Sequence, residues 1–461
     1  MNHRFLISIV ISCFALFNIA QAQNPVSGKP ANVLRLSLEQ AQAYANENNY
    51  DLRNSTTDVE IAGKMVKQNT AIGLPQISAG IDYMDYIQTP TTVIPNFMLG
   101  ILPDTTGRAP KTLEMKLGMK YSVSAKVSVS QLIYSGQYLV GLQTAKAFLE
   151  TSKQKNLKDK VDVRDRVADA YMLLLVIDQG LEILDSTYVV VNRLVNEARI
   201  SFQNGLIEDI DVDQAELNRS NLEAIVTDTR NSRNVSYAGF KFLIGLKDGQ
   251  ECVLTDNLNF FLAQVDRDAL IAQPFDYRNN IDFTLLKKQD YLVLMQYKLS
   301  KTAYQPTLAG FFSYAQNAQR DEWNFFQSSQ SWFNPINWGL SLSIPIWSSG
   351  SRKYSVDQAR LNVEKTKVTD EKSRVGLQLQ VETAKKDFSN SYSVYKNKKK
   401  GFETALKIYE KTTTKYQQGL SSSTDLNQRY SQFLQTNSDY MQSIYTVLSA
   451  KIKLTKLLEK F

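Results

Sequence analysis

Histidine and cysteine are almost missing from this 461-residue sequence. The one histidine is His3, and the two cysteines are Cys13 and Cys252. His3 and Cys13 fall in an N-terminal segment that we expect to be removed, which leaves no histidine and one cysteine. This composition excludes histidine-based acid–base chemistry, the commonest metal ligand and a disulfide within one chain.

The sequence also lacks a glycine-rich phosphate loop, a nucleophile elbow and acidic or thiol ligands at metal-binding spacing. We therefore expect no enzyme activity, and no catalytic residue, cofactor or metal site. The net charge of +7 is spread along the chain, except for a run at Lys396, Lys398, Lys399 and Lys400. A solvated helix face explains this run better than a nucleic-acid site does, so we expect no nucleic-acid partner.

The N-terminus has the pattern of a secretory signal. Arg4 precedes an apolar run from Phe5 to Ala20, and the following residues predict cleavage after Ala22, which makes 1–22 a signal peptide. The run is shorter than the ~20 residues of a spanning helix. Lipid attachment at Cys13 stays open as an alternative, although the apolar run continues beyond it. No later run of 18 apolar residues exists, so an exported chain that crosses a membrane would have to do so as a β-barrel.

A proline-free stretch from Gly350 to Leu426 organises the rest of the chain. Within it, one set of positions recurs in steps of four and three, which is the 3.5-residue period of long helices packed in a supercoiled seam. At roughly 1.5 Å per residue, the span from Ser351 to Tyr416 predicts a rod about 100 Å long. The positions are Leu377, Val381, Ala384, Phe388, Ser391, Tyr395, Lys398, Phe402, Ala405, Tyr409, Thr412 and Tyr416.

The same spacing occurs 214 residues earlier, where the seam runs from Val163 to Phe202 and all twelve positions are apolar. The flanking glycines keep this offset, since Gly136 precedes Gly350 and Gly205 precedes Gly419. Such self-similarity indicates a tandem duplication. We predict a first repeat at 23–247, a linker at 248–276 that adds a strand or short helix, and a second repeat at 277–461.

Each repeat combines helices with one β-hairpin. We expect two helices in the first repeat, separated at Asn48-Asn49, or one in the second, then a hairpin at about 76–131 or 306–347, a long helix at about 137–203 or 351–417, and a return helix. The hairpin segments alternate apolar and polar residues, as at Ile77, Ala79, Ile81 and Tyr83, which is the period of a strand. A soluble hairpin and a membrane-spanning hairpin both fit this pattern. If the strands span a membrane, four are too few to close a barrel, because the smallest have eight, so the barrel must be shared between chains.

The ordered set of these features resembles the TolC-type outer-membrane efflux proteins. The residues that carry the resemblance are Leu74-Pro75-Gln76-Ile77, the glycines Gly136 and Gly350, and the two helix turns ending in Gly205-Leu206 and Gly419-Leu420. The resemblance covers nearly the whole mature chain. It implies an α+β membrane protein that is a homotrimer, with a 12-stranded barrel in outer-membrane lipid and a periplasmic α-helical barrel.

The resemblance also assigns roles at the helix turns. Gly205, Leu206, Gly419 and Leu420 would form a periplasmic tip that contacts an adaptor, although the leucines could instead cap their turns. Asp211, Tyr416 and Asp425 would belong to a gate, although a helix-dipole role for the aspartates and seam packing for Tyr416 are equally compatible. This chain has Ser421 and Gln428 where the best-known member has a gate arginine and a constriction aspartate. We hypothesise that Asp209 and Asp213 substitute for the missing carboxylate.

The function that the resemblance implies is a passive exit duct for a tripartite efflux pump, with a periplasmic adaptor and an inner-membrane transporter as partners. A duct for type I protein secretion or for heavy-metal efflux is the alternative. A periplasmic coiled-coil scaffold with soluble hairpins is a third possibility, from a different class.

Overall fold

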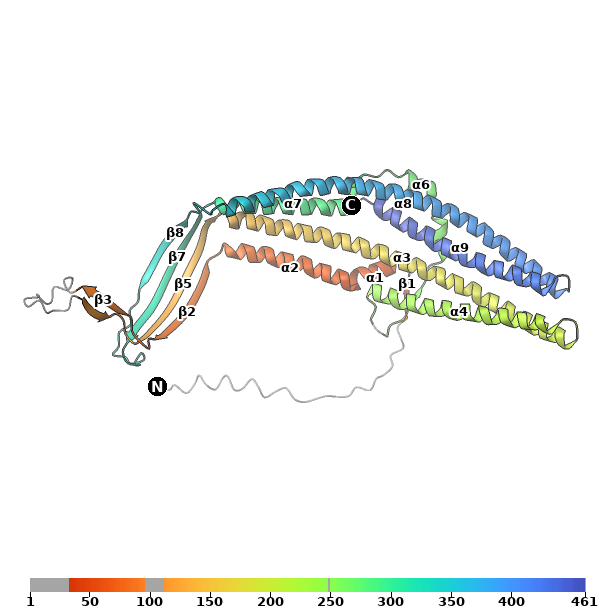
Figure 1. The fold of residues 1–461 in the computed structure, drawn as a ribbon, viewed down its shortest axis with the longest axis horizontal. Coiled ribbons are helices and arrows are strands. Elements are labelled where there is room, and N and C mark those ends of the chain that lie inside the picture. Colours follow the sequence, from red (N-terminus) through yellow and green to blue (C-terminus); the bar gives the residue numbers. More distant parts are fainter. Residues whose placement is uncertain (1–32, 96–111, 248, 461) are drawn as a thin grey trace, which may run out of the picture.

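The computed structural model describes residues 33–95, 112–247 and 249–460. The predicted signal peptide 1–22, with His3 and Cys13, lies outside the described residues. The molecule is a long rod: a β-sheet stands at one end, and two helical hairpins form the other end (Figure 1). Within the described ranges, no helix has both the length and the apolar composition needed to cross a membrane.

The helices and strands follow one another in the order of the two predicted repeats. In the first repeat they are β1 (Leu34–Leu36), α1 (Leu38–Asn48), α2 (Tyr50–Ile72), β2 (Gln76–Asp85), β3 (Thr91–Pro95), β4 (Thr112–Lys116), β5 (Tyr121–Ser135), α3 (Gly136–Gln203) and α4 (Asp209–Ile244). Between the repeats lie β6 (Cys252–Leu254), α5 (Leu258–Ala263) and α6 (Arg267–Ala272). The second repeat contains η2 (Tyr277–Asn279), α7 (Ile281–Lys301), η3 (Thr302–Tyr304), β7 (Thr307–Arg320), β8 (Ile336–Ser343), α8 (Ser351–Gln417) and α9 (Ser423–Leu458).

The main sheet has the strand order β2-β5-β7-β8, and every neighbouring pair is antiparallel. Register aligns residues of one kind into rows across all four strands. One row is apolar, with Ile77 opposite Val129, Val129 opposite Phe312 and Phe312 opposite Trp338. The next row is polar and joins Ser78, Ser128, Ser313 and Asn337, because adjacent residues of a strand point to opposite faces. The sheet therefore has one apolar and one polar face, as the alternating pattern predicts.

Two features of the hairpin regions differ from the predicted ones. A separate two-stranded ribbon, β3–β4, interrupts the interval 76–131, where we expected only a loop. Each of its strands has five residues, which is too short for a period-two pattern to stand out beside Pro90, Pro95 and Pro110. The second difference is in the strand ends. β5 continues to Ser135, beyond the predicted end at 131, whereas β8 ends at Ser343, before the predicted end at 347.

The long helices α3 and α8 run from the sheet to the far end, and shorter helices complete each half of the rod. Near the sheet, α2 and α7 pack against α3, and α7 also packs against α8. Towards the far end, α4 packs against α3 and α9 packs against α8, while α3 and α9 join the two hairpins. The seam positions Val163, Val167 and Leu174 of α3 and Val381 and Phe388 of α8 are buried, whereas Phe202 at the end of the seam is 46% exposed.

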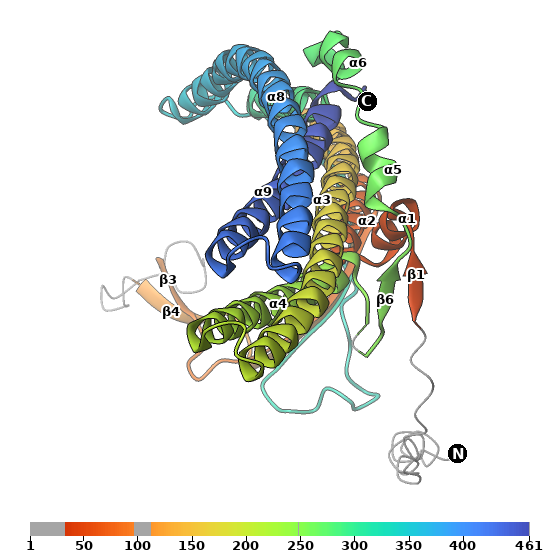
Figure 2. The ribbon, with the colours of Figure 1, turned by 90° about the vertical axis from the view of Figure 1, so that its right-hand side faces the viewer.

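The segment between the repeats wraps around the middle of the rod. Its strand β6 pairs in parallel with β1 (Figure 2). Its helix α5 buries Leu258 and Phe261 in the core that α3 and α9 share. The buried Tyr171 of α3 donates its hydroxyl hydrogen to the Leu36 carbonyl over 3.0 Å, which ties the rod to β1. The segment therefore adds both a strand and short helices at this position.

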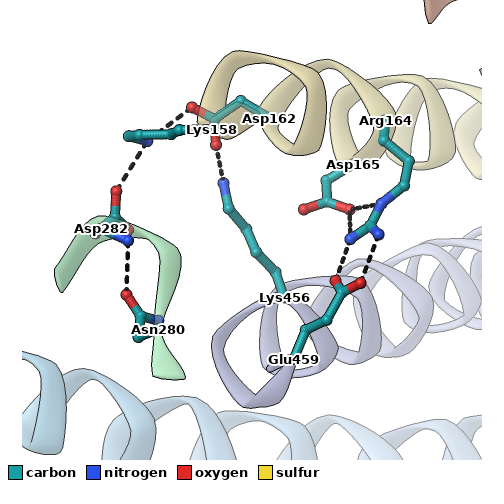
Figure 3. A network of polar contacts seen from close by, with 8 residues as sticks. All are labelled: Lys158, Asp162, Arg164, Asp165, Asn280, Asp282, Lys456 and Glu459. Carbon is teal, nitrogen blue, oxygen red and sulfur yellow. Dashed lines mark hydrogen bonds and ion pairs between the residues drawn. The ribbon is translucent and has the colours of Figure 1, made fainter. Parts of the chain in front are cut away.

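A polar network near the middle of the rod connects the C-terminal end of α9 to α3 (Figure 3). The Lys456 ammonium lies 2.6 Å from a carboxylate oxygen of Asp162, and Lys158 bridges Asp162 and Asp282 at 2.8 and 3.0 Å. Arg164 binds both carboxylate oxygens of Glu459. Burial disfavours the charged form of Asp162, but hydrogen bonds from the two ammonium groups outweigh burial and lower its pKa. The network thus joins α3, α7 and α9, which come from both repeats.

Candidate functional site

The two helix turns at the far end of the rod have the same backbone geometry. In the first turn, Gly205 has φ +71°, its N–H donates to the Phe202 carbonyl over 2.8 Å, and the Leu206 N–H donates to Ser201 over 2.9 Å. In the second turn, Gly419 has φ +73°, with equivalent bonds of 2.9 Å to Tyr416 and 2.8 Å from Leu420 to Lys415. This paired arrangement is a Schellman motif, in which the left-handed position favours glycine.

The leucines that follow these glycines face solvent. Leu206 is 74% exposed and Leu420 is 72% exposed. A leucine that capped its turn through a hydrophobic contact with the preceding helical turn would bury most of this area. The capping alternative therefore does not describe either leucine, and both present their apolar side chains at the tip.

The predicted gate aspartates occupy the first turns of the return helices, but they make different contacts. Asp211 of α4 accepts a short hydrogen bond from the Ser423 hydroxyl at the start of α9, so it joins the two hairpins. Asp425 accepts from Ser421 over 2.9 Å and pairs with Arg429 at 3.3 Å, both in its own hairpin. Each carboxylate also lies where the helix dipole favours negative charge. Asp211 therefore connects the two hairpins, whereas the contacts of Asp425 lie within its own hairpin.

The structure separates the other proposed gate residues. Asp209 accepts from the neighbouring Ile210 N–H over 2.9 Å, and Asp213 makes no ion pair with any described residue; both side chains are exposed. Tyr416 is half-buried, and its burial, together with the nearby carboxylates of Asp211 and Glu197, raises its pKa. Tyr416 and Asp211 therefore share one site, whereas Asp209 and Asp213 lie outside it on α4. Gln428 is exposed on α9.

Two further contacts join the hairpins near the tip, and the sequence analysis missed both. The Gln417 amide donates to Glu197 over 3.0 Å, which links α8 to α3. Asn218 of α4 donates a short hydrogen bond to Asn427 of α9. The repeat offset could have given part of this signal, because it relates equivalent positions of the two hairpins. Asn427 and Asn218 lie 209 residues apart, close to the offset of 214.

A groove lies between the two hairpins at the tip, with a volume of about 910 Å³. It opens beside Leu206 and Gly419, and Asp211, Tyr416 and Glu197 line it. Ser421, which has an uncharged hydroxyl, also lines the groove, at the position where the best-known member of the resembling family has a gate arginine. Hydrogen bonds between carboxylates, hydroxyls and amides therefore hold the hairpins together here, and this site has no catalytic arrangement among its described residues.

The fold matches solved outer-membrane channels along almost its full length. CusC superposes with a TM-score of 0.70 at 13% sequence identity, over 92% of this chain and 92% of that one. The Campylobacter jejuni CmeC outer membrane channel superposes with a TM-score of 0.69 at 15% identity, over 91% of this chain and 85% of that one. At these identities the likeness shows the fold, which confirms the predicted fold class.

Sequence comparison identifies the family. The outer membrane protein TolC of Vibrio cholerae is 23% identical over 241 residues, and the match spans 51% of this chain and 54% of that protein. The matched part is thus about half the length of this curated relative. The profile described as "Outer membrane efflux protein" matches residues 41–246 and 292–459, which include the sheet, both rods and both tip turns. The chain therefore belongs to the outer membrane efflux protein family, and it is a TolC-like protein of the outer membrane.

Proposed function

We propose that three copies of this chain form a passive exit duct across the outer membrane and into the periplasm. The observation that carries the proposal is the four-stranded sheet, whose outer strands β2 and β8 pair with no further strand among the described residues. Its apolar face is exposed, with Ile77, Ile81 and Trp338 each more than 70% exposed. Pairing β8 of one copy with β2 of the next removes the open edges and gives twelve strands, with apolar residues towards lipid.

The tip is the proposed contact with a periplasmic adaptor, which connects the duct to an inner-membrane transporter. The exposed Leu206 and Leu420 support this role, because two apolar side chains on matching turns offer the same anchor twice per copy. The proposed gate consists of Asp211 and Tyr416, with Asp425 nearby in the second turn. Asp209 and Asp213 lie outside the groove of one copy, and we propose that they line the constriction only when three copies are assembled. In this proposal, the bond between Asp211 and Ser423 keeps the two hairpins together and the tip narrow.

Size and conductance measurements test the duct directly. We expect the protein to fractionate with outer membranes, to have the mass of three copies in mild detergent, and to conduct ions in planar bilayers. A monomer recovered in the soluble fraction would contradict the proposal and favour a periplasmic scaffold. Deletion of the gene, followed by drug, metal and secreted-protein profiling, distinguishes a drug duct from a metal or protein-secretion duct.

Three sets of variants test the tip. Asp211→Ala should increase the single-channel conductance, because it removes a bond between the hairpins. Glu223→Ala on the same helix, whose exposed carboxylate makes no ion pair with any described residue, serves as the matched control. Replacing Asp209 and Asp213 together by Asn should reduce block by multivalent cations if these residues line the constriction. Unchanged block would remove both residues from the gate. Leu206→Glu with Leu420→Glu should abolish export and adaptor crosslinking without changing conductance.

A further inference from the structure

A cavity lies near the middle of the rod, beside the segment that joins the two repeats. Its volume is about 640 Å³, and pockets of about 300–1,000 Å³ are the size that takes a drug-sized molecule. Its walls come from α1, α3, α5 and α9, with residues that follow α5, α6 and α9. In Figure 1, α8 lies on one side of α3 and α9, and α2 and α4 lie on the other, and none of the described lining residues belongs to these outer helices. The cavity is thus formed within one chain.

Most of the cavity wall is apolar. Met172 of α3, Phe261 of α5 and Leu448 of α9 line it, and all three side chains are buried. Ala168 of α3 is also buried in the wall, and its side chain is a single methyl group. A molecule that fills this space gains most from an apolar body, because the free energy of burial grows with the apolar area removed from water.

Three of the charged residues in the wall bind one another. The Arg164 guanidinium lies between the carboxylates of Asp165 and Glu459 (Figure 3). It donates to one oxygen of Asp165 and to both oxygens of Glu459, which are three of the four carboxylate oxygens in this group. Burial raises the pKa of Asp165, so the charged form of this side chain is disfavoured. The group therefore carries at most one negative charge, and most of its acceptors are already in use.

The other two charged residues in the wall are both basic, Lys451 and Lys460. The Lys451 ammonium donates to the Gln264 carbonyl over 3.2 Å, and it forms no ion pair with any described residue. Burial lowers the pKa of Lys451, because the charged form loses water without gaining a carboxylate from the described chain. An ammonium has three donor hydrogens, so the bond to Gln264 leaves two for a ligand. A carboxylate supplies both the opposite charge and the acceptors that Lys451 lacks.

We propose that this cavity binds an anionic amphiphile, whose carboxylate bonds to Lys451 and whose apolar body lies against Met172, Phe261 and Leu448. The bound molecule contacts α3 of the first repeat, α9 of the second and α5 between them, so it connects the two repeats near the middle of the rod. Two sources supply this chemistry: a fatty acid released from membrane lipid, and a rigid aryl carboxylate of the kind that a duct carries as cargo.

Acylation of lysines tests the site in the full-length protein reconstituted in phosphatidylcholine nanodiscs. Dodecanoate should slow acylation of Lys451 several-fold and in a saturable manner, because the bound carboxylate covers the ammonium and favours its charged form. Mass spectrometry of the labelled peptides measures the rate at each lysine. Lys453, which is exposed on the same helix and is not among the residues that line the cavity, is the internal reference and should react at an unchanged rate.

Three further probes separate the head group from the body of the ligand. Dodecanol and dodecylammonium have the same chain without a negative charge, and each should bind roughly ten-fold more weakly than dodecanoate, because a hydrogen bond between charged groups is lost. Naphthalene-2-carboxylate represents the rigid aryl acids. Protection of Lys451 by dodecanoate alone assigns the site to fatty acids, and protection by the naphthalene acid alone assigns it to aryl acids. Protection by neither acid, or equal protection by dodecanol, would overturn the inference.

Variants of the cavity wall complete the test, with equilibrium binding of radiolabelled dodecanoate and dodecanol as the measurement. Lys451→Met should weaken dodecanoate binding roughly ten-fold and leave dodecanol binding unchanged, whereas Lys451→Arg should keep the preference for the acid. Ala168→Leu narrows the cavity and should weaken binding of both probes, and Lys453→Met should affect neither.

Dodecanoate binding that is unchanged in Lys451→Met would contradict the assigned site. The inference does not depend on the proposed function, because one chain forms the cavity. Its failure would leave the three-copy mass and the conductance as expected, whereas a soluble monomer that still binds dodecanoate would contradict the duct alone.

Discussion

The two helical hairpins at the tip have the same backbone but are held together by different side chains. In α8–α9, aromatic rings form a continuous ladder: Tyr395 stacks on Tyr440, Tyr440 on Phe402, and Tyr409 on Phe433, with centroids 6.2, 5.1 and 5.3 Å apart. In α3–α4, aliphatic residues fill the seam, and ion pairs flank it. Arg230 lies 2.7 Å from Asp185, and Arg199 lies 2.5 Å from Glu216.

The difference shows which properties of the repeat are constrained. Both hairpins keep the 3.5-residue seam, because long helices packed in a supercoil require that period. Both also keep the glycine at the turn, because few other residues adopt the left-handed conformation there. The side chains that fill the seam differ, since stacked rings and aliphatic chains can occupy the same space between two helices. A single core cluster, containing Val191, Leu194, Tyr409 and Phe433, then joins the two hairpins laterally.

The largest difference between the hairpins should appear at Phe433. Its ring is 2% exposed and stacks on Tyr409, so Phe433→Ala should cost about 3–5 kcal/mol of local stability. Relative to wild type, the assembled Phe433→Ala variant should show a larger increase in hydrogen-exchange rate in α8–α9 than in α3–α4. The equivalent position in the first repeat, Arg219, gives the control Arg219→Ala, which should change little. Equal loss of protection in both hairpins would contradict a separate aromatic ladder.

The two tip glycines should respond alike. Gly205→Ala and Gly419→Ala place a side chain at positive φ, with open space around the new Cβ, so each should destabilise its turn by roughly 1–2 kcal/mol. Gly376→Ala in the interior of α8, where the added Cβ also meets no neighbour, should instead stabilise by about 0.5–1 kcal/mol. Proteolysis rates at the tip measure the effects of the two turn variants, and hydrogen exchange in α8 measures that of Gly376→Ala. A clearly larger effect at one turn would show that the turns differ beyond their backbone.

The ion pairs of α3–α4 should matter less than the rings of α8–α9. Asp185→Asn removes the pair with Arg230, whose side chains are 46% and 57% exposed, so the expected loss is less than about 1 kcal/mol. Chemical denaturation at low and high salt measures it, and the difference between wild type and variant should shrink at high salt. A salt-independent loss above 2 kcal/mol would mean that this pair carries a packing role.

The last predicted effect is absent at neutral pH and appears only in alkaline solution. Burial, followed by the neighbouring Tyr395 and Glu403, raises the pKa of Tyr440 to about 12 from its ordinary 10.0. The folded state holds this proton more tightly, so its stabilising contribution is complete below pH 10 and is lost as the pH rises from about 10 to 12. Tyrosinate absorbance should show a late-titrating group that disappears in Tyr440→Phe. Titration at the ordinary pKa in wild type would contradict the burial of this ring.

Much of the fold could be predicted from periodicity and repetition. The seam positions and the offset of 214 predicted the paired rods, and Gly205 and Gly419 predicted two matching turns, because a left-handed residue after a long helical pattern has few alternatives. The short ribbon β3–β4 was missed, since five-residue strands beside prolines carry too little pattern. The exposure of Leu206 and Leu420 was left open by the sequence, because it depends on how much of each turn the neighbouring helix covers.

The amino-acid sequence by itself determined the local properties of this protein: helix length, strand alternation, turn position and the duplication. These depend on neighbours along the chain and on spacing, so they can be read without knowing what packs against what. Only the tertiary structure decided that Asp211 accepts a hydrogen bond from Ser423 of the other hairpin, while Asp425 bonds to Ser421 of its own hairpin. The contact between Asp211 and Ser423 joins residues about 200 positions apart, and it arises from how the helices are set side by side.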